Sequence, residues 1–408
     1  MTTCWRRASS VVAVLLASLV ASLPVAAQNK PIRIGVTTAL QVQVGRDTVD
    51  AMQMAIDEVN AKGGVLGRKF EMVVADETEN PETGINAVKK LTGDDKVDVL
   101  VGGYTSGVTL AQLPHISRAK TIYLGIGASS PAITQRVKQD YENYRYVFRV
   151  GPANSIYLAR DLVGFIHDVV IGELGCRKIA IVGENAKWVQ DLAPTLKKGV
   201  TDAGADVSIT ELFDTQTSDF SPLLAKVRES GAQFIVHLLS HASSDVFVKQ
   251  WYDARTPIPI GGIDVKSQDA DFFTRVGGKA LSQMPVITTL RAPITPLTVP
   301  FWDAFVKKTG RAGPVYTAFG AYAALNIYAQ AVQRAKTTDT DAVIKELEKT
   351  DYLGPGGRIQ FDDSHDVKSG PGLVQLLVFQ WQENGKRVIV WPKDKQNGRV
   401  IMPPWIQK

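Results

Sequence analysis

The chain of 408 residues is poor in cysteine and histidine, with two of the first and five of the second. Cys4 lies close to the N-terminus, so removal of the N-terminal segment described below would leave Cys176 alone. A single cysteine forms no internal disulfide, and packing must then stabilise the fold. His237 and His241 are four residues apart but flank the end of a predicted strand, where the spacing does not suit a shared metal. We therefore expect no disulfide and no metal site.

The sequence also lacks the common catalytic signatures. It contains no G-x-x-x-x-G-K-S/T phosphate loop, no G-x-S-x-G nucleophile elbow and no H-E-x-x-H zinc motif. A dinucleotide fingerprint begins at Gly125-Ile126-Gly127, but Ser130 stands where the third glycine is needed. We therefore expect a protein that is not an enzyme and that carries no cofactor.

Charge is nearly balanced, with 46 basic and 41 acidic residues and a formal net charge of +5. Loss of residues 1–27 would remove two arginines and no acid, so the net charge would fall from +5 to +3. Such a mild excess does not favour nucleic acid as a partner. After the N-terminus, no apolar run reaches the roughly 20 residues that a membrane-spanning helix needs.

The N-terminus has the pattern of a signal peptide. Two arginines precede an apolar run over residues 11–20, and small residues at Val25 and Ala27 fit a cleavage site. An anchor helix is the alternative, but the run is short and is followed by Ser22 and Pro24. We predict a signal peptide over residues 1–27, a mature chain from Gln28 and export to the periplasm.

Predicted strands and helices alternate from Pro31 onwards. Apolar, β-rich runs predict strands at residues 32–37, 70–75, 97–101 and 122–126. Apolar residues at helical spacing predict helices at 47–61, 81–91 and 110–119. The alternation restarts at residue 156 and continues to residue 261, which predicts a second lobe of the same kind. Short loops between alternating elements indicate βαβ units and parallel sheets covered on both faces.

Three predicted helices follow the second lobe, at residues 299–309, 316–335 and 341–350. They need a sheet to cover, and the simplest arrangement returns the chain to the first lobe. We predict an α/β fold of two Rossmann-like lobes with parallel sheets, joined by hinge strands at 145–151 and 284–289. Lobe 1 comprises residues 28–148 plus 288–354, and lobe 2 comprises residues 149–287 plus 355–408. Several crossovers between lobes favour hinge bending.

Two loops of the first lobe are rich in small and hydroxyl residues. Residues 102–107 and 127–131 each follow a predicted strand and precede a helix. Ligands of open parallel sheets bind beyond the carboxyl ends of the strands, and helix N-termini favour anions. These loops therefore make a candidate carboxylate site, although glycine and serine are also ordinary helix caps and composition leaves both interpretations open.

One stretch of the sequence is specific, namely Ala55-Ile56-Asp57-Glu58-Val59-Asn60-Ala61-Lys62-Gly63-Gly64-Val65-Leu66-Gly67-Arg68-Lys69. On these residues first, the chain resembles the leucine/isoleucine/valine-binding protein family of type I periplasmic binding proteins. It continues in order through the Ser106 loop, residues 128–134 and residues 147–149, and it covers essentially all of the mature chain. It implies two lobes that close on a small ligand, and a membrane permease of an ABC importer as partner.

The resemblance also implies ligand-binding positions. Ser106 in the first loop, with Gly127, Ala128 and Ser129 in the second, correspond to the positions that hold a ligand carboxylate. On the second lobe, Trp188 occupies the usual aromatic position after the first strand. Ser240 stands where amino-acid binders place another aromatic residue, and Asp264 is the candidate acid for an α-ammonium group.

Three departures from the family pattern concern the ammonium half of the site and a disulfide. Val44 and Ser240 replace aromatic residues, while Glu79 and Thr105 occupy the positions of the family's common disulfide. A small carboxylate, first of all a branched-chain or other hydrophobic amino acid, is the expected ligand. An amine-free aromatic or aliphatic acid stays open, as does a periplasmic sensor that presents its ligand to a receptor.

Overall fold

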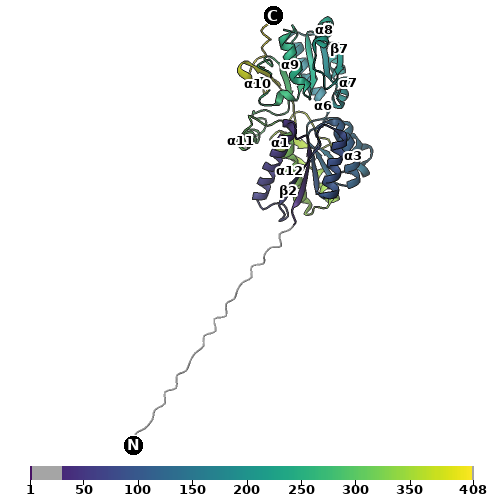
Figure 1. The fold of residues 1–408 in the computed structure, drawn as a ribbon, viewed down its shortest axis with the longest axis vertical. Helices are drawn as coiled ribbons and strands as arrows, with labels where there is room; N and C mark the ends of the chain where they lie inside the picture. Colours follow the sequence, from purple (N-terminus) through teal and green to yellow (C-terminus); the bar gives the residue numbers. More distant parts are fainter. Residues whose placement is uncertain (2–29, 407–408) are drawn as a thin grey trace.

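Two parallel sheets form two lobes stacked end to end in the computed structural model (Figure 1), which confirms the predicted fold class. The structure describes Met1 and residues 30–406. The predicted signal peptide, apart from Met1, lies outside the described residues. Within those residues, no helix combines the length and apolarity that crossing a membrane requires.

The first lobe is built on a five-stranded parallel sheet in the order β2-β1-β3-β4-β5. Its strands are β1 (Ile32–Thr38), β2 (Phe70–Asp76), β3 (Val99–Gly102), β4 (Ile122–Gly125) and β5 (Val147–Arg149). Its helices are α1 (Gln43–Ala61), α2 (Pro81–Lys89), α3 (Ser106–Ala119), α4 (Ala132–Gln139), α5 (Tyr141–Tyr144), α11 (Thr298–Thr309), α12 (Tyr316–Ala335) and α13 (Thr340–Leu347). The three late helices thus cover the first sheet, as their position in the sequence predicted.

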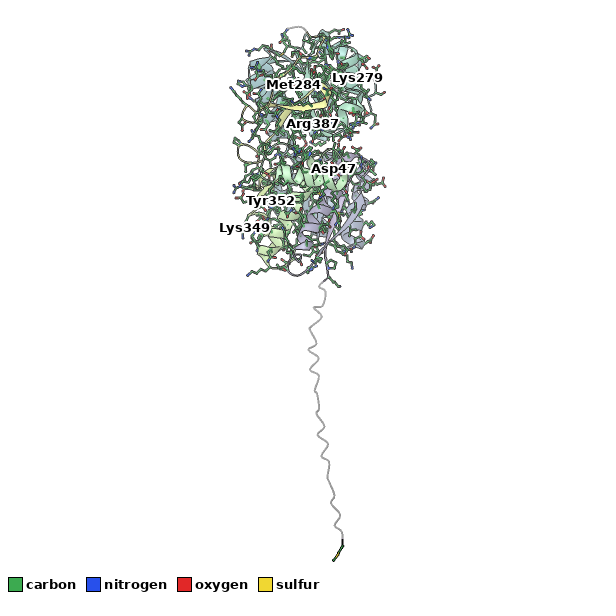
Figure 2. All side chains as sticks on the ribbon, turned by 90° about the vertical axis from the view of Figure 1, so that its left-hand side faces the viewer. Asp47, Lys279, Met284, Lys349, Tyr352 and Arg387 are labelled. Carbon is green, nitrogen blue, oxygen red and sulfur yellow. The ribbon has the colours of Figure 1, made fainter. Side chains whose placement is uncertain are left out.

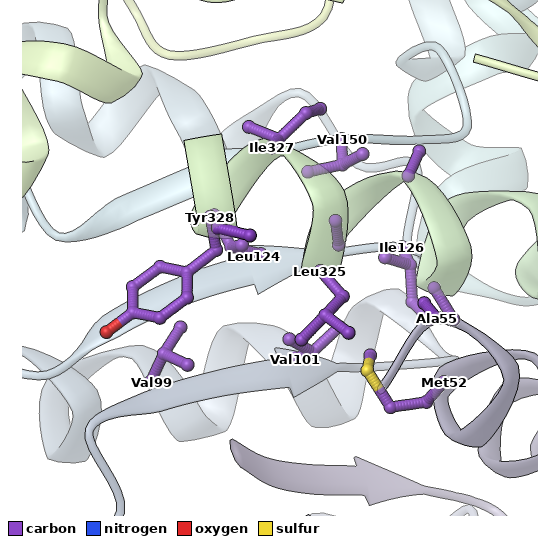
Figure 3. Packing of buried hydrophobic residues seen from close by; sticks show 14 of the residues in the cluster. Met52, Ala55, Val99, Val101, Leu124, Ile126, Val150, Leu325, Ile327 and Tyr328 are labelled. Carbon is purple, nitrogen blue, oxygen red and sulfur yellow. The ribbon is translucent and has the colours of Figure 1, made fainter. Parts of the chain in front are cut away.

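Alternation along the strands divides the first lobe into two cores. Val99 and Val101 of β3 face the core that contains α12, whereas Leu100 faces the opposite core beside α2 and α3. Figure 3 shows Leu325 and Tyr328 of α12 over Val99 and Val101 of β3, with Met52 of α1 beside them. Successive side chains of a strand point to opposite faces, so a sheet covered on both faces needs continuous apolar runs of this kind.

The second lobe has a seven-stranded sheet in the order β14-β13-β10-β9-β8-β6-β7, with β13 antiparallel to β10 and to β14. Its strands are β6 (Lys178–Glu184), β7 (Asp206–Phe213), β8 (Phe234–Leu239), β9 (Ile260–Asp264), β10 (Met284–Ile287), β13 (Leu377–Gln382) and β14 (Lys386–Trp391). Its helices are α6 (Ser155–Phe165), α7 (Lys187–Asp202), α8 (Ser221–Glu229), α9 (Ser243–Asp253) and α10 (Phe272–Arg275). Short π-helical segments extend α2 and α6, at Lys90–Asp94 and Ile166–Glu173.

The chain passes between the lobes three times: after β5, after β10 and before β13. The last passage comes later than residue 355, where we predicted it. The hairpin of β11 (Asp351–Gly354) and β12 (Gly357–Gln360) belongs to the first lobe, because Ile359 and Phe361 are part of its core. Figure 2 shows Tyr352 in the same lobe as Asp47, with Met284 and Arg387 in the other. Val374 still packs in the first core and Leu376 in the second, which places this passage between them.

Candidate functional site

A cavity of about 240 Å³ lies between the lobes, beyond the carboxyl ends of their parallel strands. The first lobe contributes Tyr104, Thr105, Ser106, Gly107, Gly127, Ser129 and Tyr316. The second lobe contributes Leu158, Ala186, Lys187, Trp188, Thr215, Ser240, His241, Ile263, Val265, Gln268, Val286, Ile287 and Leu376, and the hinge contributes Pro152 and Thr288. The volume is below the roughly 300–1,000 Å³ of clefts for drug-sized molecules, so the cavity suits a smaller ligand.

Ser106 begins α3 directly after the loop that follows β3. No side chain caps this helix at Thr105, so the first-turn amides are left to meet a ligand. The Ser106 hydroxyl oxygen accepts a hydrogen bond of 3.1 Å from the Ser130 amide, which fixes it beside the second loop. Its own proton is still available to donate. The helix end and this hydroxyl together favour an anionic group.

Gly127 brings the second loop against the first. A Cβ at this position would collide with the carbonyl oxygen of Gly103, so the two loops can lie this close only around a glycine. The Tyr316 hydroxyl donates to the Gly127 carbonyl oxygen at 3.1 Å. Ser129 is 6% exposed, and its carbonyl oxygen accepts from the Ser155 amide at 2.7 Å. Ser106, Gly127 and Ser129 therefore form one wall of the cavity.

Arg149 holds the second loop from behind. Its guanidinium donates to the carbonyl oxygens of Ala128 and Ser130 and forms an ion pair of 2.8 Å with Asp366. Both charged side chains are almost fully buried. Ala128 itself packs in the core beneath the loop and does not line the cavity. Because the carbonyl groups of Ala128 and Ser130 bond to Arg149, the conformation of the second loop is fixed before any ligand arrives.

Trp188 and Ser240 face the cavity from the second lobe. The Trp188 indole N–H donates to the Ser240 hydroxyl oxygen at 3.1 Å, so the indole offers a ligand its ring rather than its N–H group. Ser240 in turn donates to the buried Glu184 carboxylate, from its amide at 2.9 Å and from its hydroxyl at 2.8 Å. Ser240 thus orients Trp188 instead of replacing the missing aromatic ring.

His241 lies on the second-lobe wall between two carboxylates. Its Nδ1 lies 2.8 Å from Glu184 Oε2, and its Nε2 lies 3.8 Å from Glu79 Oε1 of the first lobe. Burial alone would lower the pKa of His241, but the hydrogen bond and charge of Glu184, with the charge of Glu79, raise it above its usual value. Burial would likewise raise the pKa of Glu184, yet the bonds from His241 and Ser243 lower it. His241 and Glu184 therefore each favour the charged form of the other.

Asp264 does not line the cavity, although its neighbours Ile263 and Val265 do. Its fully buried carboxylate accepts hydrogen bonds from Ser244 at 2.7 Å and from Gln283 at 2.8 Å, inside the second lobe. Burial raises the pKa of Asp264 to about 7, a rise that these two hydrogen bonds partly oppose. The carboxylate therefore faces away from the position that an ammonium group of a ligand would take.

The lobes touch directly around the cavity. The Tyr104 hydroxyl donates to the Ser240 carbonyl oxygen at 2.8 Å, and the Ser130 hydroxyl donates to Asp191 at 2.5 Å. Val265 of the second lobe packs with Val44 and Tyr104 of the first in a small apolar cluster. These contacts describe a closed arrangement of the two lobes around the cavity.

Comparisons with known proteins agree with this arrangement. The family model described as "Periplasmic binding protein" matches residues 31–386. The chain belongs to this family.

Its relatives indicate what the family binds. A leucine-, isoleucine-, valine-, threonine- and alanine-binding protein of Pseudomonas aeruginosa is 25% identical over 350 residues, which cover 83% of this chain and 85% of the relative. LivJ of Streptococcus pneumoniae, solved with isoleucine, aligns with a TM-score of 0.75 at 21% identity and covers 89% and 100% of the two chains. A solute-binding protein of Rhodopseudomonas palustris, solved with 3,4-dihydroxybenzoic acid, has a TM-score of 0.75 at 19% identity and covers 92% and 99%. Members of this family bind small molecules as partners of ABC transporters.

The polar residues of the periplasmic binding protein's cavity that sequence reasoning missed include Tyr104, His241, Gln268 and Tyr316. Tyr104 stands inside the first predicted loop, so its neighbours gave a signal for it. His241 directly follows Ser240 and was considered only as a metal ligand. Gln268 follows strand β9, and Tyr316 begins helix α12. No local pattern marks either of them as a cavity residue. Their position depends on how the lobes meet.

Proposed function

We propose that this protein is exported to the periplasm and captures a small carboxylate ligand between its lobes for delivery to an ABC permease. The observation that carries the proposal is the wall of Ser106, Gly127 and Ser129 at the end of α3, enclosed by the second lobe. Free amides and hydroxyls at a helix N-terminus bind carboxylates well, and exclusion of water strengthens such hydrogen bonds.

Closure follows from the ligand's contacts with both lobes. A ligand first binds the first-lobe wall and then contacts Trp188 and the apolar side chains of the second lobe. A ligand can shift the balance between open and closed forms only by as much as it prefers one of them. Tyr104 and Ser130 add direct bonds between the lobes in the closed form. No covalent step is required, and the ligand is released unchanged.

Two ligand classes fit this proposal. Relatives named for leucine, isoleucine and valine favour a branched-chain or other hydrophobic amino acid. The complex with 3,4-dihydroxybenzoic acid favours an amine-free aromatic acid, and so does Asp264, whose carboxylate faces away from the cavity. A sensor that presents the same ligand to a receptor uses the same cavity, and only the membrane partner distinguishes it from a transport protein.

Titration calorimetry on the chain from Gln28 tests the proposal with hydrophobic amino acids and aromatic and branched aliphatic acids. We expect saturable binding of at least one carboxylate, a smaller radius of gyration in solution scattering when it is bound, and recovery of the unchanged ligand by mass spectrometry. The carboxamide analogue of the same ligand is the control and should bind more weakly. Equal affinity for the carboxamide, or conversion of the ligand, would contradict the proposal.

A further inference from the structure

Gln268 lines the cavity and carries a side-chain oxygen without a hydrogen-bond partner in the described part of the chain. The residue is 6% exposed and belongs to the second lobe. Its backbone is fixed, because the backbone N–H donates to Val265 and the backbone carbonyl accepts from Arg387 at 3.1 Å. Buried polar groups in native proteins are nearly always paired. A ligand in the cavity that this side chain borders can supply the missing partner after rotation of the side-chain amide.

His241 offers a second polar group on the same lobe. Its Nδ1 is engaged by Glu184 and lies 3.0 Å from the Ser240 hydroxyl. Its Nε2 lies 3.8 Å from Glu79, which is beyond hydrogen-bond distance, so this ring nitrogen is available to a ligand. A neutral hydroxyl matches an imidazole nitrogen and a side-chain amide well, because it can both donate and accept a hydrogen bond.

The described lining of the cavity contains no carboxylate. Asp191 is held by Lys187 and by the Ser130 hydroxyl. Glu184 accepts from His241, Ser240 and Ser243. Glu79 lies 3.8 Å from His241 Nε2, and its Oε1 has no hydrogen-bond partner among the described residues, but Glu79 does not line the cavity. An α-ammonium group in this cavity would lose its hydration without gaining a carboxylate partner from the lining.

The cavity is apolar between the first-lobe wall of Ser106, Gly127 and Ser129 and the polar side chains of Gln268 and His241. Trp188, Ile263, Val265 and Val286 supply it from the second lobe. Ser240 accepts the indole N–H of Trp188, so the rest of the ring is what Trp188 offers to a ligand. Flat or branched hydrocarbon bodies fit such a wall, and an aromatic ring gains additional stabilisation from the indole.

We propose that the cavity selects amine-free carboxylic acids that carry a hydroxyl group at the end facing the second lobe, with Gln268 and His241 as the residues that recognise this hydroxyl. The inference rests on the proposed capture of a carboxylate and adds the chemical class of the ligand. The first-lobe wall holds the carboxylate, the apolar middle holds the ring, and the two second-lobe side chains distinguish a phenol from its unsubstituted analogue.

Calorimetry with four matched ligands tests two preferences of the unmodified mature protein: the preference for acids without an amine and the preference for a hydroxyl group. The set is 3-(4-hydroxyphenyl)propanoate, 3-phenylpropanoate, L-tyrosine and L-phenylalanine, in which the amine and the hydroxyl vary independently. The shorter pair of 4-hydroxybenzoate and benzoate, and the aliphatic pair of L-leucine and 4-methylpentanoate, extend the set to other body sizes. We expect each amine-free acid to bind at least about tenfold more tightly than its amino acid, and each phenol about two- to tenfold more tightly than its parent acid.

Two variants assign the hydroxyl preference to Gln268. Gln268→Leu keeps the size but removes the polarity, so it should abolish the preference for the phenol and leave the affinity for the parent acid unchanged or higher. Gln268→Glu introduces a negative charge and should weaken acids while improving amino acids. Gln190→Leu is the matched control, because Gln190 is exposed on α7 and lies outside the cavity lining. It should retain the preference.

The outcomes separate the two proposals. If no carboxylate of the set binds, both this inference and the proposed function fail. If L-leucine or L-phenylalanine binds more tightly than its amine-free analogue, the inference is overturned and the capture of carboxylates stands. If phenols and parent acids bind equally to the unmodified protein, Gln268 and His241 do not recognise a hydroxyl, and this result needs no variant to be folded.

Discussion

Tyr104 and Ser240 are joined across the cleft by a single hydrogen bond, in which the phenolic hydroxyl of one lobe donates to the backbone carbonyl of the other at 2.8 Å. Both residues are buried. The bond exists only when the lobes are closed, so it belongs to the free-energy difference between the open and closed forms rather than to the stability of either lobe.

Tyr104→Phe should therefore weaken ligand binding by about 0.5–1.5 kcal/mol, the usual contribution of a neutral hydrogen bond. Calorimetry gives the affinity, and solution scattering should show a larger average radius at subsaturating ligand. Tyr123→Phe is the matched control, because Tyr123 donates to Gly102 within the first lobe. It should lower the unfolding free energy without changing the radius. An unchanged affinity for Tyr104→Phe would exclude a role in closure.

The serine wall predicts a second result. Ser106→Ala combined with Ser129→Ala should weaken carboxylate binding by on the order of 2–4 kcal/mol, because each lost bond to a charged group costs about 1.5–3 kcal/mol and the two effects overlap. Calorimetry measures this loss. Ser208→Ala serves as control, since Ser208 bonds within the second lobe, 3.1 Å from Ser230. Unchanged affinity of the double variant would move the carboxylate to another part of the cavity.

Arg149 predicts a combined loss of stability and affinity. Arg149→Met leaves Asp366 as an uncompensated buried charge, which typically costs about 3–5 kcal/mol of unfolding free energy. It also frees the carbonyl groups of Ala128 and Ser130, so the surviving folded protein should bind its ligand more weakly. Denaturant unfolding and calorimetry measure the two effects. Arg291→Met, which breaks an exposed pair with Asp303, should leave both stability and binding nearly unchanged.

Asp264 predicts a dependence of stability on pH. Its folded-state pKa, raised by burial to about 7, lies above the usual aspartate pKa of 3.8. The folded protein therefore holds a proton that the unfolded chain releases, and this carboxyl lowers stability as pH rises from about 4 to about 7. His237 lies 3.9 Å away with a pKa lowered by burial to about 3, so it acts in the opposite direction over pH 3–6.5.

Asp264→Asn removes the Asp264 contribution. The variant should gain unfolding free energy relative to the unmodified protein between pH 5 and pH 8, by at most on the order of 4 kcal/mol. The Gln283 Oε1 atom, which has no partner within the described chain, can accept from the new amide after rotation. Thermal unfolding at several pH values measures the gain. Ligand affinity should not change for amino acids or amine-free acids, because Asp264 lies outside the lining.

The sequence predicted the fold well because the apolar runs are long and regular. The predicted range of α12, residues 316–335, matches the structure. Helix α3 begins earlier than the predicted residue 110, at Ser106, because its first turn faces the cleft and lacks the apolar period of a buried face. Strand β12 was assigned to the wrong lobe, because it pairs only with the short strand β11 and local pattern does not tell which core it covers.

The candidate site was predicted better in the first lobe than in the second. Ser106, Gly127 and Ser129 follow strands of one sheet, and parallel topology brings such positions together. The second lobe was harder to predict, because its side chains compete for one another's hydrogen bonds. Asp264 has the residue type of an ammonium partner, yet Ser244 and Gln283 bind it from behind. Gln268 has no local signal and reaches the cleft through the tertiary arrangement.

Asp366 bonds to three parts of the molecule at once: to Arg149 under the binding loop, to Thr134 of α4 at 2.7 Å, and to Asn154 at the start of α6 at 3.0 Å. Asn154 thus sits at the pivot, where rotation of the second lobe displaces atoms least. The binding loop should keep one shape throughout the swing. The rate of ligand association then depends on the first lobe alone, whereas the residence time depends on the second. Substitutions in the second lobe should lengthen or shorten that residence while ligands arrive as fast as before.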